Sequence, residues 1–327
     1  MGDMSRALRK QMLTMINLLD KANIVLKANL TANHMNEDGI RQLLADCQET
    51  AITMGNELEM IYGEGTELVH KLEEYHESLY QMTQVLKHPG KRYELIKELT
   101  GQIRQAGKLL DEQIPDRLEV VFLPYKASMW DSMERFWSAS QSDEDCDIYV
   151  VPIPYYDRGL DGDFIRYHYE GDEMPSHVQV THYENYNLQK RWPDTVFIQN
   201  PYDETDSEIS IDPRFYSPEL KNVVETLVYI PPFLYESVLM AEREELDFCT
   251  APGVRNADMV IVSSEDIKQR YINALVENFG EYTRKTWEDK IFSMRSMDIG
   301  KETEQGDSAP EITAKCNDSI ETTEISP

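Results

Sequence analysis

Three apolar runs that each end at a polar, aromatic-rich turn constrain the fold of this 327-residue chain more than any other feature. Val120–Pro124 leads into YKASMWD, Ile148–Pro154 into YYDR, and Thr195–Gln199 into NPYDE. Apolar runs that alternate with helical patterns are typical of a parallel sheet covered on both faces. Because the carboxyl ends of parallel strands meet at one edge of the sheet, we expect the three turns to form a ligand site there.

The same alternation of strands and helices continues through the rest of this region. Further strands are expected at His177–Thr181, Thr226–Ile230 and Met259–Val262. Helices are expected at Ser128–Ser138, Pro218–Val223, Glu236–Glu244, Ser264–Phe279 and Tyr282–Met294. From about Ser296 the chain is rich in Glu, Thr and Ser and has few large apolar residues, which predicts a disordered tail.

The first third of the chain has the apolar spacing of packed helices. Residues 5–113 repeat apolar side chains every three or four positions in four runs, and Gly, Pro or Asn cluster between the runs. The runs begin at Leu8, Leu44, Leu68 and Ile96. We therefore predict an α/β protein with a helical bundle at 1–117, a parallel-sheet domain at 118–295 and a tail at 296–327. The alternative is that the helical seams recruit another subunit, for example as a homo-oligomer.

Composition excludes several classes of function. The formal net charge is −28, which repels a phosphate backbone, so we expect no nucleic-acid partner. No apolar run approaches the roughly 20 residues of a membrane span. The start, MGDMSRALRK, has no apolar signal segment, and Arg6 breaks the myristoylation pattern. We expect a cytoplasmic protein, with peripheral attachment to the inner face of the membrane as the alternative.

The turns after the first two strands supply candidate ligand-binding residues. Lys126 and Ser128 lie where the first strand turns into a helix, and Ser128 is a candidate N-cap at a helix N-terminus that could hold an anion. Tyr155, Tyr156 and Asp157 follow the second strand and could bind a polyol or stack on a ring. Packing of these tyrosines on the following loop is the alternative.

A histidine beside a carboxylate is the candidate for acid–base chemistry. His168 and Glu170 lie two residues apart in YHYEGD, so they share one side of an extended loop. Two such ligands make a weak metal site, and the four cysteines form no CxxC pair, so no metal or cofactor is expected. A surface loop with an incidental histidine is the alternative.

The turn after the third strand combines an amide, a phenol and two acids. Asn200 precedes a proline and is therefore held extended, with its amide free to enter a crevice. Tyr202, Asp203 and Glu204 follow, and the two carboxylates are close enough to raise one another's pKa or to hold a pair of hydroxyls. We assign Asp203, with His168 and Glu170, to the catalytic candidates. A turn with capping residues is the alternative.

These motifs carry a resemblance to a known family. The ordered strings VVFLPYKASMWDS, YVVPIPYYD, HYEGD, FIQNPYDE, LVYIPPF and ADMVIVSSE span Leu118–Ile291. Over this span the chain resembles bacterial CDP-glycerol:glycerophosphate glycerophosphotransferase-like proteins, which are GT-B-type enzymes of teichoic-acid and surface-polymer assembly.

The resemblance implies two Rossmann-like domains with a site between them, of which this chain would hold the acceptor half. It implies a nucleotide-activated polyol (CDP-glycerol) as donor and a polyol phosphate as acceptor. The second domain would then come from a partner chain. Gln199 stands where the resemblance leads us to expect a basic histidine. The expected function is therefore transferase-like, and the alternative is a non-catalytic binding or assembly subunit that acts through its helices.

Overall fold

The computed structural model describes residues 4–31, 36–232 and 247–294. The chain divides into two compact units between Asp116 and Arg117, one residue before the predicted domain boundary. The predicted tail at 296–327 and the predicted helix Glu236–Glu244 lie outside the described residues.

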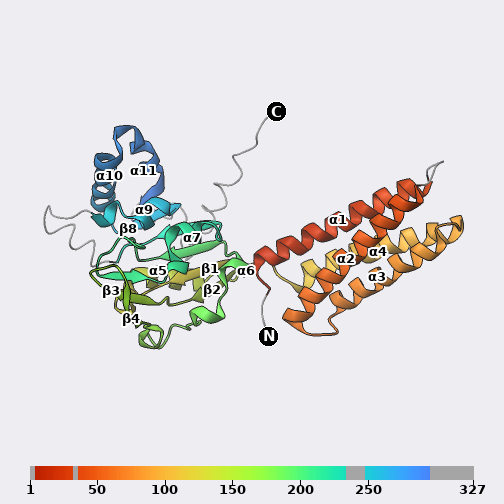
Figure 1. Ribbon diagram of the computed structural model, residues 1–327, viewed down its shortest axis with the longest axis horizontal. Coiled ribbons are helices and arrows are strands. Elements are labelled where there is room, and N and C mark those ends of the chain that lie inside the picture. Colours follow the sequence, from red (N-terminus) through yellow and green to blue (C-terminus); the bar gives the residue numbers. More distant parts are fainter. Residues whose placement is uncertain (1–3, 32–35, 233–246, 295–327) are drawn as a thin grey trace, which may run out of the picture. The chain divides into compact units, whose positions relative to one another are not determined.

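The first unit is a bundle of four helices (Figure 1). They are α1 (Arg6–Thr31), α2 (Glu37–Tyr62), α3 (Glu67–Val85) and α4 (Pro89–Gln113). Side-chain caps from Asn36 and Thr66 begin α2 and α3, and Pro89 occupies the first position of α4. The helix spacing of the sequence therefore predicted this unit correctly.

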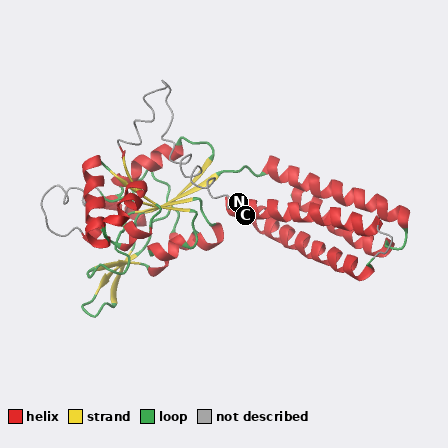
Figure 2. Ribbon diagram, turned by 90° about the horizontal axis from the view of Figure 1, so that it is seen from above, coloured by secondary structure: helices red, strands yellow, loops and turns green. Residues whose placement is uncertain are grey.

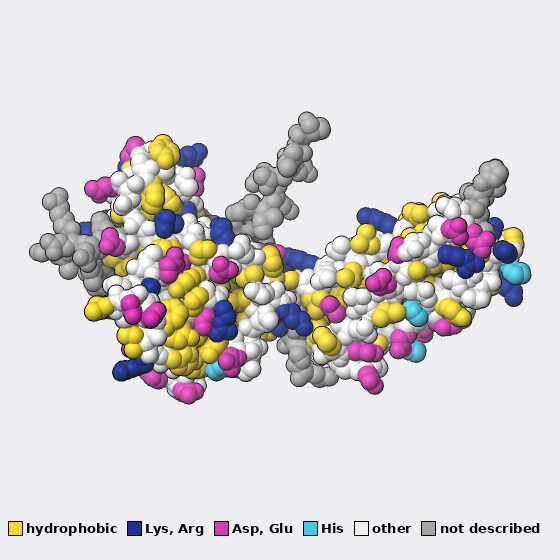
Figure 3. Space-filling view, in the orientation of Figure 1, with side chains coloured by type: hydrophobic (Ala, Val, Ile, Leu, Met, Phe, Trp, Pro, Cys, Tyr) yellow, Lys and Arg dark blue, Asp and Glu magenta, His cyan; other side chains and the backbone are white. Residues whose placement is uncertain are grey.

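The apolar seams of the four helices are buried against one another inside the bundle. Met12, Leu44, Leu79 and Leu99, one from each helix, are at most 1% exposed. Figure 3 shows a visible face of the bundle on which charged and hydrophobic side chains are mixed. The interpretation of the seams as the core of an ordinary bundle is confirmed, because each seam is covered by the chain's own helices.

The second unit is built on a six-stranded, wholly parallel sheet. In spatial order the strands are β2 (Cys146–Val150), β1 (Leu118–Leu123), β5 (Thr195–Ile198), β7 (Thr226–Tyr229), β8 (Met259–Val262) and β9 (Ile291–Ser293). The chain runs outward from β1 to β2 and then outward on the other side from β5 to β9. This reversal of direction makes the β1/β5 boundary a topological switch point. The predicted α/β fold with a parallel sheet is confirmed.

Helices cover both faces of this sheet, as Figure 2 shows with helices in red on either side of the yellow strands. On one face Trp130, the N-cap of α5 (Asp131–Gln141), packs edge-on against Phe122 of β1, and Phe136 of α5 stacks on Phe197 of β5. The other face is covered by α6 (Leu188–Arg191), α7 (Ser217–Lys221), α9 (Pro252–Asn256) and α10 (Glu265–Phe279). Strands buried on both faces explain why the runs are apolar throughout rather than alternating.

Three elements differ from the prediction. The segment His177–Thr181 is not a strand, because only Val180 pairs with Val150, through an isolated bridge. The predicted helix Tyr282–Met294 is shorter, α11 (Arg284–Lys290), and is followed by the edge strand β9. A strand of three residues is too short for its period to be read from the sequence.

A second, antiparallel sheet, the small sheet, was not predicted from the sequence. It consists of β4 (Phe164–His168), β3 (Tyr155–Arg158) and β6 (Ile209–Ile211), with β3 in the centre. The residues of β4 are mostly exposed, so this strand has no apolar face that would mark it in the sequence. Two segments that were predicted as loops, the one after β2 and the one that contains His168, are therefore strands β3 and β4 of this sheet.

Candidate functional site at the carboxyl edge of the sheet

The turns after β1 and β5 lie side by side at the carboxyl edge of the parallel sheet. Leu123, the last residue of β1, pairs with Ile198, the last residue of β5. The backbone N–H of Ile153 donates to the carbonyl of Pro124, which brings the start of the small sheet to the same edge. Open α/β sheets bind ligands at such a switch point.

Lys126 lies against the start of the small sheet. Its Nζ is 5.3 Å from the ring centroid of Tyr155 and 5.5 Å from that of Tyr125. These are cation–π distances. The predicted residues Lys126 and Tyr155 are therefore brought together, although 29 positions separate them along the chain.

Glu170 joins the turn after β1 to the small sheet. Its Oε2 accepts a hydrogen bond of 2.8 Å from the backbone N–H of Ala127, and its Oε1 accepts one from the hydroxyl of Tyr155. Burial first, and then the hydrogen bond to Glu170, raises the pKa of Tyr155 well above its usual value. Both oxygens of Glu170 are engaged, so it positions this site rather than exchanging protons in it.

His168 and Asp157 form a pair on the strands β4 and β3. The His168 Nε2 lies 3.0 Å from the Asp157 Oδ2, and the imidazole stacks on the Tyr155 ring at 4.8 Å between centroids. We expected Glu170 to be the acid beside this histidine, but its close carboxylate is that of Asp157. Nδ1, the other ring nitrogen, makes no hydrogen bond to any described residue.

Tyr156 belongs to a different environment from Tyr155 because successive side chains of a strand point to opposite sides. Its hydroxyl donates to the Oδ2 of Asp212 at 3.4 Å, and its ring stacks on Phe164 at 4.6 Å. Burial is the main reason that the pKa of Tyr156 is raised. Tyr156 therefore packs on the small sheet and is not part of the group around Lys126.

The predicted residues after β5 mostly shape their own turn. The Oδ1 of Asn200 accepts hydrogen bonds from the backbone N–H groups of Tyr202 (2.9 Å) and Asp203 (3.1 Å). Tyr202 is half-buried against the core, whereas Glu204 is exposed. Gly253 packs directly on this turn, because a Cβ on it would lie 2.9 Å from the Cα of Pro201.

Asp203 anchors the start of α7. It has a left-handed backbone with φ of 51°, and its buried carboxylate accepts from both the backbone N–H and the hydroxyl of Ser217. Burial raises the pKa of Asp203 to about 6, while the Ser217 hydrogen bonds oppose that rise. The proximity of Glu204 also raises this pKa, as expected, but it contributes less than burial.

Gln199 and Ser128 differ from their expected settings. The buried Gln199 Nε2 donates to the Met129 carbonyl (2.6 Å) and the Ser132 hydroxyl (3.0 Å), so this side chain ties β5 to the start of α5. Ser128 does not cap that helix, because α5 begins at Asp131 with Trp130 at its N-cap. Ser128 is instead exposed in the short 3₁₀ turn Ala127–Met129 that comes first.

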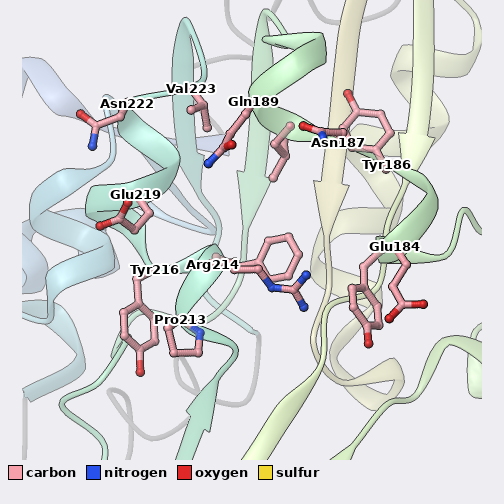
Figure 4. Close-up of a pocket in the computed structure, with 13 residues that line it drawn as sticks. Glu184, Tyr186, Asn187, Gln189, Pro213, Arg214, Tyr216, Glu219, Asn222 and Val223 are labelled. Atoms are coloured by element: carbon pink, nitrogen blue, oxygen red, sulfur yellow. The ribbon is translucent and has the colours of Figure 1, made fainter.

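A groove that sequence reasoning missed lies between two connecting segments (Figure 4). It encloses about 640 Å³. The lining comes from residues 183–189, which include the 3₁₀ turn Tyr183–Asn185 and the start of α6, and from residues 213–223, which span α7. None of the strand-end motifs lines the groove, so these motifs do not indicate it. The tyrosines and amide side chains that recur in residues 183–189 and 213–223 are the feature of the sequence that points to it.

Among residues 4–31, 36–232 and 247–294, no group of three or more His, Cys, Asp or Glu side chains could hold a metal ion. Burial raises the pKa of the Cys47 thiol to about 11 and that of the Cys146 thiol to about 12, so neither is a ready nucleophile. No helix in these ranges is long and apolar enough to cross a bilayer.

Comparisons with known proteins found no match to a family model, a curated protein or a solved structure. The arguments for function therefore rest on the chemistry of the described residues.

Proposed function

We propose that the α/β unit binds a phosphorylated polyol at the carboxyl edge of its sheet and acts as the acceptor half of a glycerophosphotransferase-like enzyme. The observation that carries this proposal is the convergence of Lys126, Tyr155, Asp157, His168 and Glu170 between the turn after β1 and the small sheet. These residues come from three separate segments of the chain. The donor would be CDP-glycerol, and a partner chain would supply the second domain.

Lys126 is the group proposed to bind phosphate. Among the described residues it makes no ion pair, and its ammonium lies only over aromatic rings. The formal charge of the whole chain is −28, so a phosphate would need a local cation to approach. An ammonium that no carboxylate neutralises meets that need.

His168 is the group proposed to take the proton from the attacking hydroxyl. Its Nε2 lies 3.0 Å from the Oδ2 of Asp157, so the proton would be taken by the other ring nitrogen. The Nδ1 of His168 has no protein partner in the described structure and is therefore the nitrogen available for this step. The stacked Tyr155 ring holds the imidazole in place, whereas the contact of its Nε2 with Asp157 lacks hydrogen-bond geometry.

The first test is calorimetric titration of the protein with CDP-glycerol, CDP and glycerol 3-phosphate, with and without magnesium. We expect at least one phosphate ligand to bind, and Lys126→Ala to weaken its binding about tenfold or more, because a charge-assisted contact contributes roughly 1.5–3 kcal/mol. Lys285→Ala is the matched control, since Lys285 is exposed on α11 and the substitution removes the same charge. Equal affinity in both variants would contradict the assignment of Lys126.

The second test separates catalysis from binding. His168→Gln is expected to leave the affinity for the phosphate ligand unchanged but to lower turnover by roughly 10²–10⁴-fold, the usual contribution of a general base. Turnover is measured as CMP release from CDP-glycerol, with the partner domain added if the chain alone is inactive. Wild-type turnover in the His168→Gln variant would refute the catalytic role.

A binding or assembly role without catalysis is the second candidate. It is favoured by the use of Gln199, Asn200 and Asp203 in internal hydrogen bonds, which removes the side chains after β5 from direct chemistry. Saturable binding of glycerol phosphate without turnover under any partner condition would support it. Absence of heat from all three ligands, with folded protein, would favour an assembly subunit.

A further inference from the structure

We propose that the groove between residues 183–189 and 213–223 is a second binding site, and that it takes an uncharged carbohydrate of two or three sugar units. This proposal is independent of the proposed transferase function, because the groove and the group around Lys126 share no lining residue. The cavity of about 640 Å³ lies within the range of roughly 300–1,000 Å³ that is usual for sites of drug-sized ligands.

The groove has an apolar floor and a polar rim. Tyr183, Tyr186, Leu188 and Phe215 form the floor, and each is at most 9% exposed. The exposed rim comprises Glu184, Asn187, Gln189, Arg214, Glu219 and Asn222. Figure 4 shows Gln189 and Glu219 on opposite sides of the opening, with the side chain of Arg214 between the two segments. An aromatic floor beneath polar groups suits a ligand with both C–H surfaces and hydroxyls.

The charge of the lining disfavours an anionic ligand. The Nε and Nη2 atoms of Arg214 donate to the two oxygens of Asp212 at 2.9 and 3.0 Å, so this carboxylate neutralises the guanidinium. Burial alone would raise the pKa of Asp212, but the hydrogen bonds from Arg214 outweigh it and lower the pKa. The remaining charged lining residues are Glu184 and Glu219, and both are acidic.

The aromatic floor also disfavours a cationic ligand. A cation would need an open ring face, but the guanidinium of Arg214 lies 5.3 Å from the Tyr183 ring centroid and 5.6 Å from that of Phe215. These two ring faces are therefore already covered by Arg214. The acidic Glu184 and Glu219 repel an anion, and the floor offers a cation no open ring face at Tyr183 or Phe215.

Unsatisfied donors and acceptors on the rim fit the hydroxyls of a sugar. The Nη1 of Arg214 makes no hydrogen bond within the described residues and can donate. The carboxylates of Glu184 and Glu219 can accept, and the amides of Gln189 and Asn222 can do both. Each hydroxyl of a sugar donates one hydrogen bond and accepts others, so it matches such a mixed lining better than a group that only donates or only accepts.

The test is saturation-transfer NMR on the full chain with maltotriose, cellotriose and N,N′-diacetylchitobiose. Choline and glycerol 3-phosphate serve as the cationic and anionic probes. We expect at least one of the three sugars to bind, and its affinity to fall about fivefold or more in Gln189→Leu and in Asn222→Leu, because each change removes a hydrogen bond to the ligand. Both positions are exposed, so neither substitution should disturb folding.

Two controls fix the location of the binding. Gln141→Leu makes the same substitution at an exposed position at the end of α5, outside the groove lining, and should bind the sugar with wild-type affinity. Lys126→Ala should also retain sugar binding even if it loses phosphate binding, which separates this site from the proposed transferase site. Binding of none of the three sugars would overturn the proposal. So would sugar binding that is unchanged in both groove variants, or choline binding that both of them weaken.

Discussion

The buried ion pair between Glu119 of β1 and Arg191 of α6 gives the sharpest prediction about stability. Glu119, at the start of β1, has a side chain only 2% exposed. Its carboxylate accepts hydrogen bonds of 2.6 and 2.7 Å from Arg191, and another from the hydroxyl of Tyr186. Arg191 also donates to the hydroxyl of Tyr149 and lies over its ring. Replacing Arg191 by Met keeps the apolar stem but leaves a buried carboxylate without its cation.

The expected cost follows from the burial of the two partners. Breaking a buried pair by removing one charge typically costs about 3–5 kcal/mol. The side chain of Arg191 is 20% exposed, so water can screen part of the loss, and we expect about 3 kcal/mol, the low end of that range. In the double variant Glu119→Gln/Arg191→Met no charge is left buried, so its loss should be at least about 1 kcal/mol smaller.

Urea unfolding monitored by tryptophan fluorescence measures this loss selectively. All four tryptophans (Trp130, Trp137, Trp192 and Trp287) lie in the second unit, so the signal reports that unit alone. For a loss of about 3 kcal/mol the midpoint should fall by about 1 M urea, if the slope is about 3 kcal/mol/M.

The matched control is Arg284→Met, which removes an arginine from an exposed pair with Glu281 and should leave the midpoint unchanged. An unchanged midpoint in Arg191→Met would refute the reasoning. A double variant less stable than Arg191→Met would refute it as well.

Three further predictions concern other parts of the chain. The pKa of Asp203 in the folded protein is raised to about 6, so the free energy of unfolding should fall as pH rises from about 4 to 6, where the unfolded chain releases this proton first. Asp203→Asn should flatten that part of the curve of stability against pH, and an unchanged slope would contradict this prediction. Gly253→Ala puts a methyl group 2.9 Å from the Cα of Pro201 and should cost about 1–3 kcal/mol by the same fluorescence assay, so wild-type stability would mean that the turn yields. In the bundle, Tyr75→Phe removes the hydroxyl that donates to the Oδ1 of the buried Asn23 at 3.0 Å. The free energy of unfolding of the bundle, followed by circular dichroism, should fall by about 1–3 kcal/mol. A shift of the tryptophan transition instead would argue against a local effect.

The sequence predicted the parts of the site that depend on strand ends. Lys126 and Tyr155 each follow an apolar run, and parallel pairing brings the ends of such runs to one edge of the sheet. It could not predict that both carboxylate oxygens of Glu170 would accept hydrogen bonds from Ala127 and Tyr155, or that Asp203 would bind the start of α7. Those roles depend on which segment lies opposite each side chain, and chain spacing does not encode that directly.

By itself, the sequence determined the four helices of the bundle, the parallel sheet and the division of the chain near residue 117, because helix and strand periods are local properties of the backbone. Only the tertiary structure decided the small antiparallel sheet, the pairing of His168 with Asp157, and the groove floored by Tyr183 and Phe215. Each of these joins segments whose own patterns are weak. They become adjacent only after the crossovers of the parallel sheet have fixed where each connection runs.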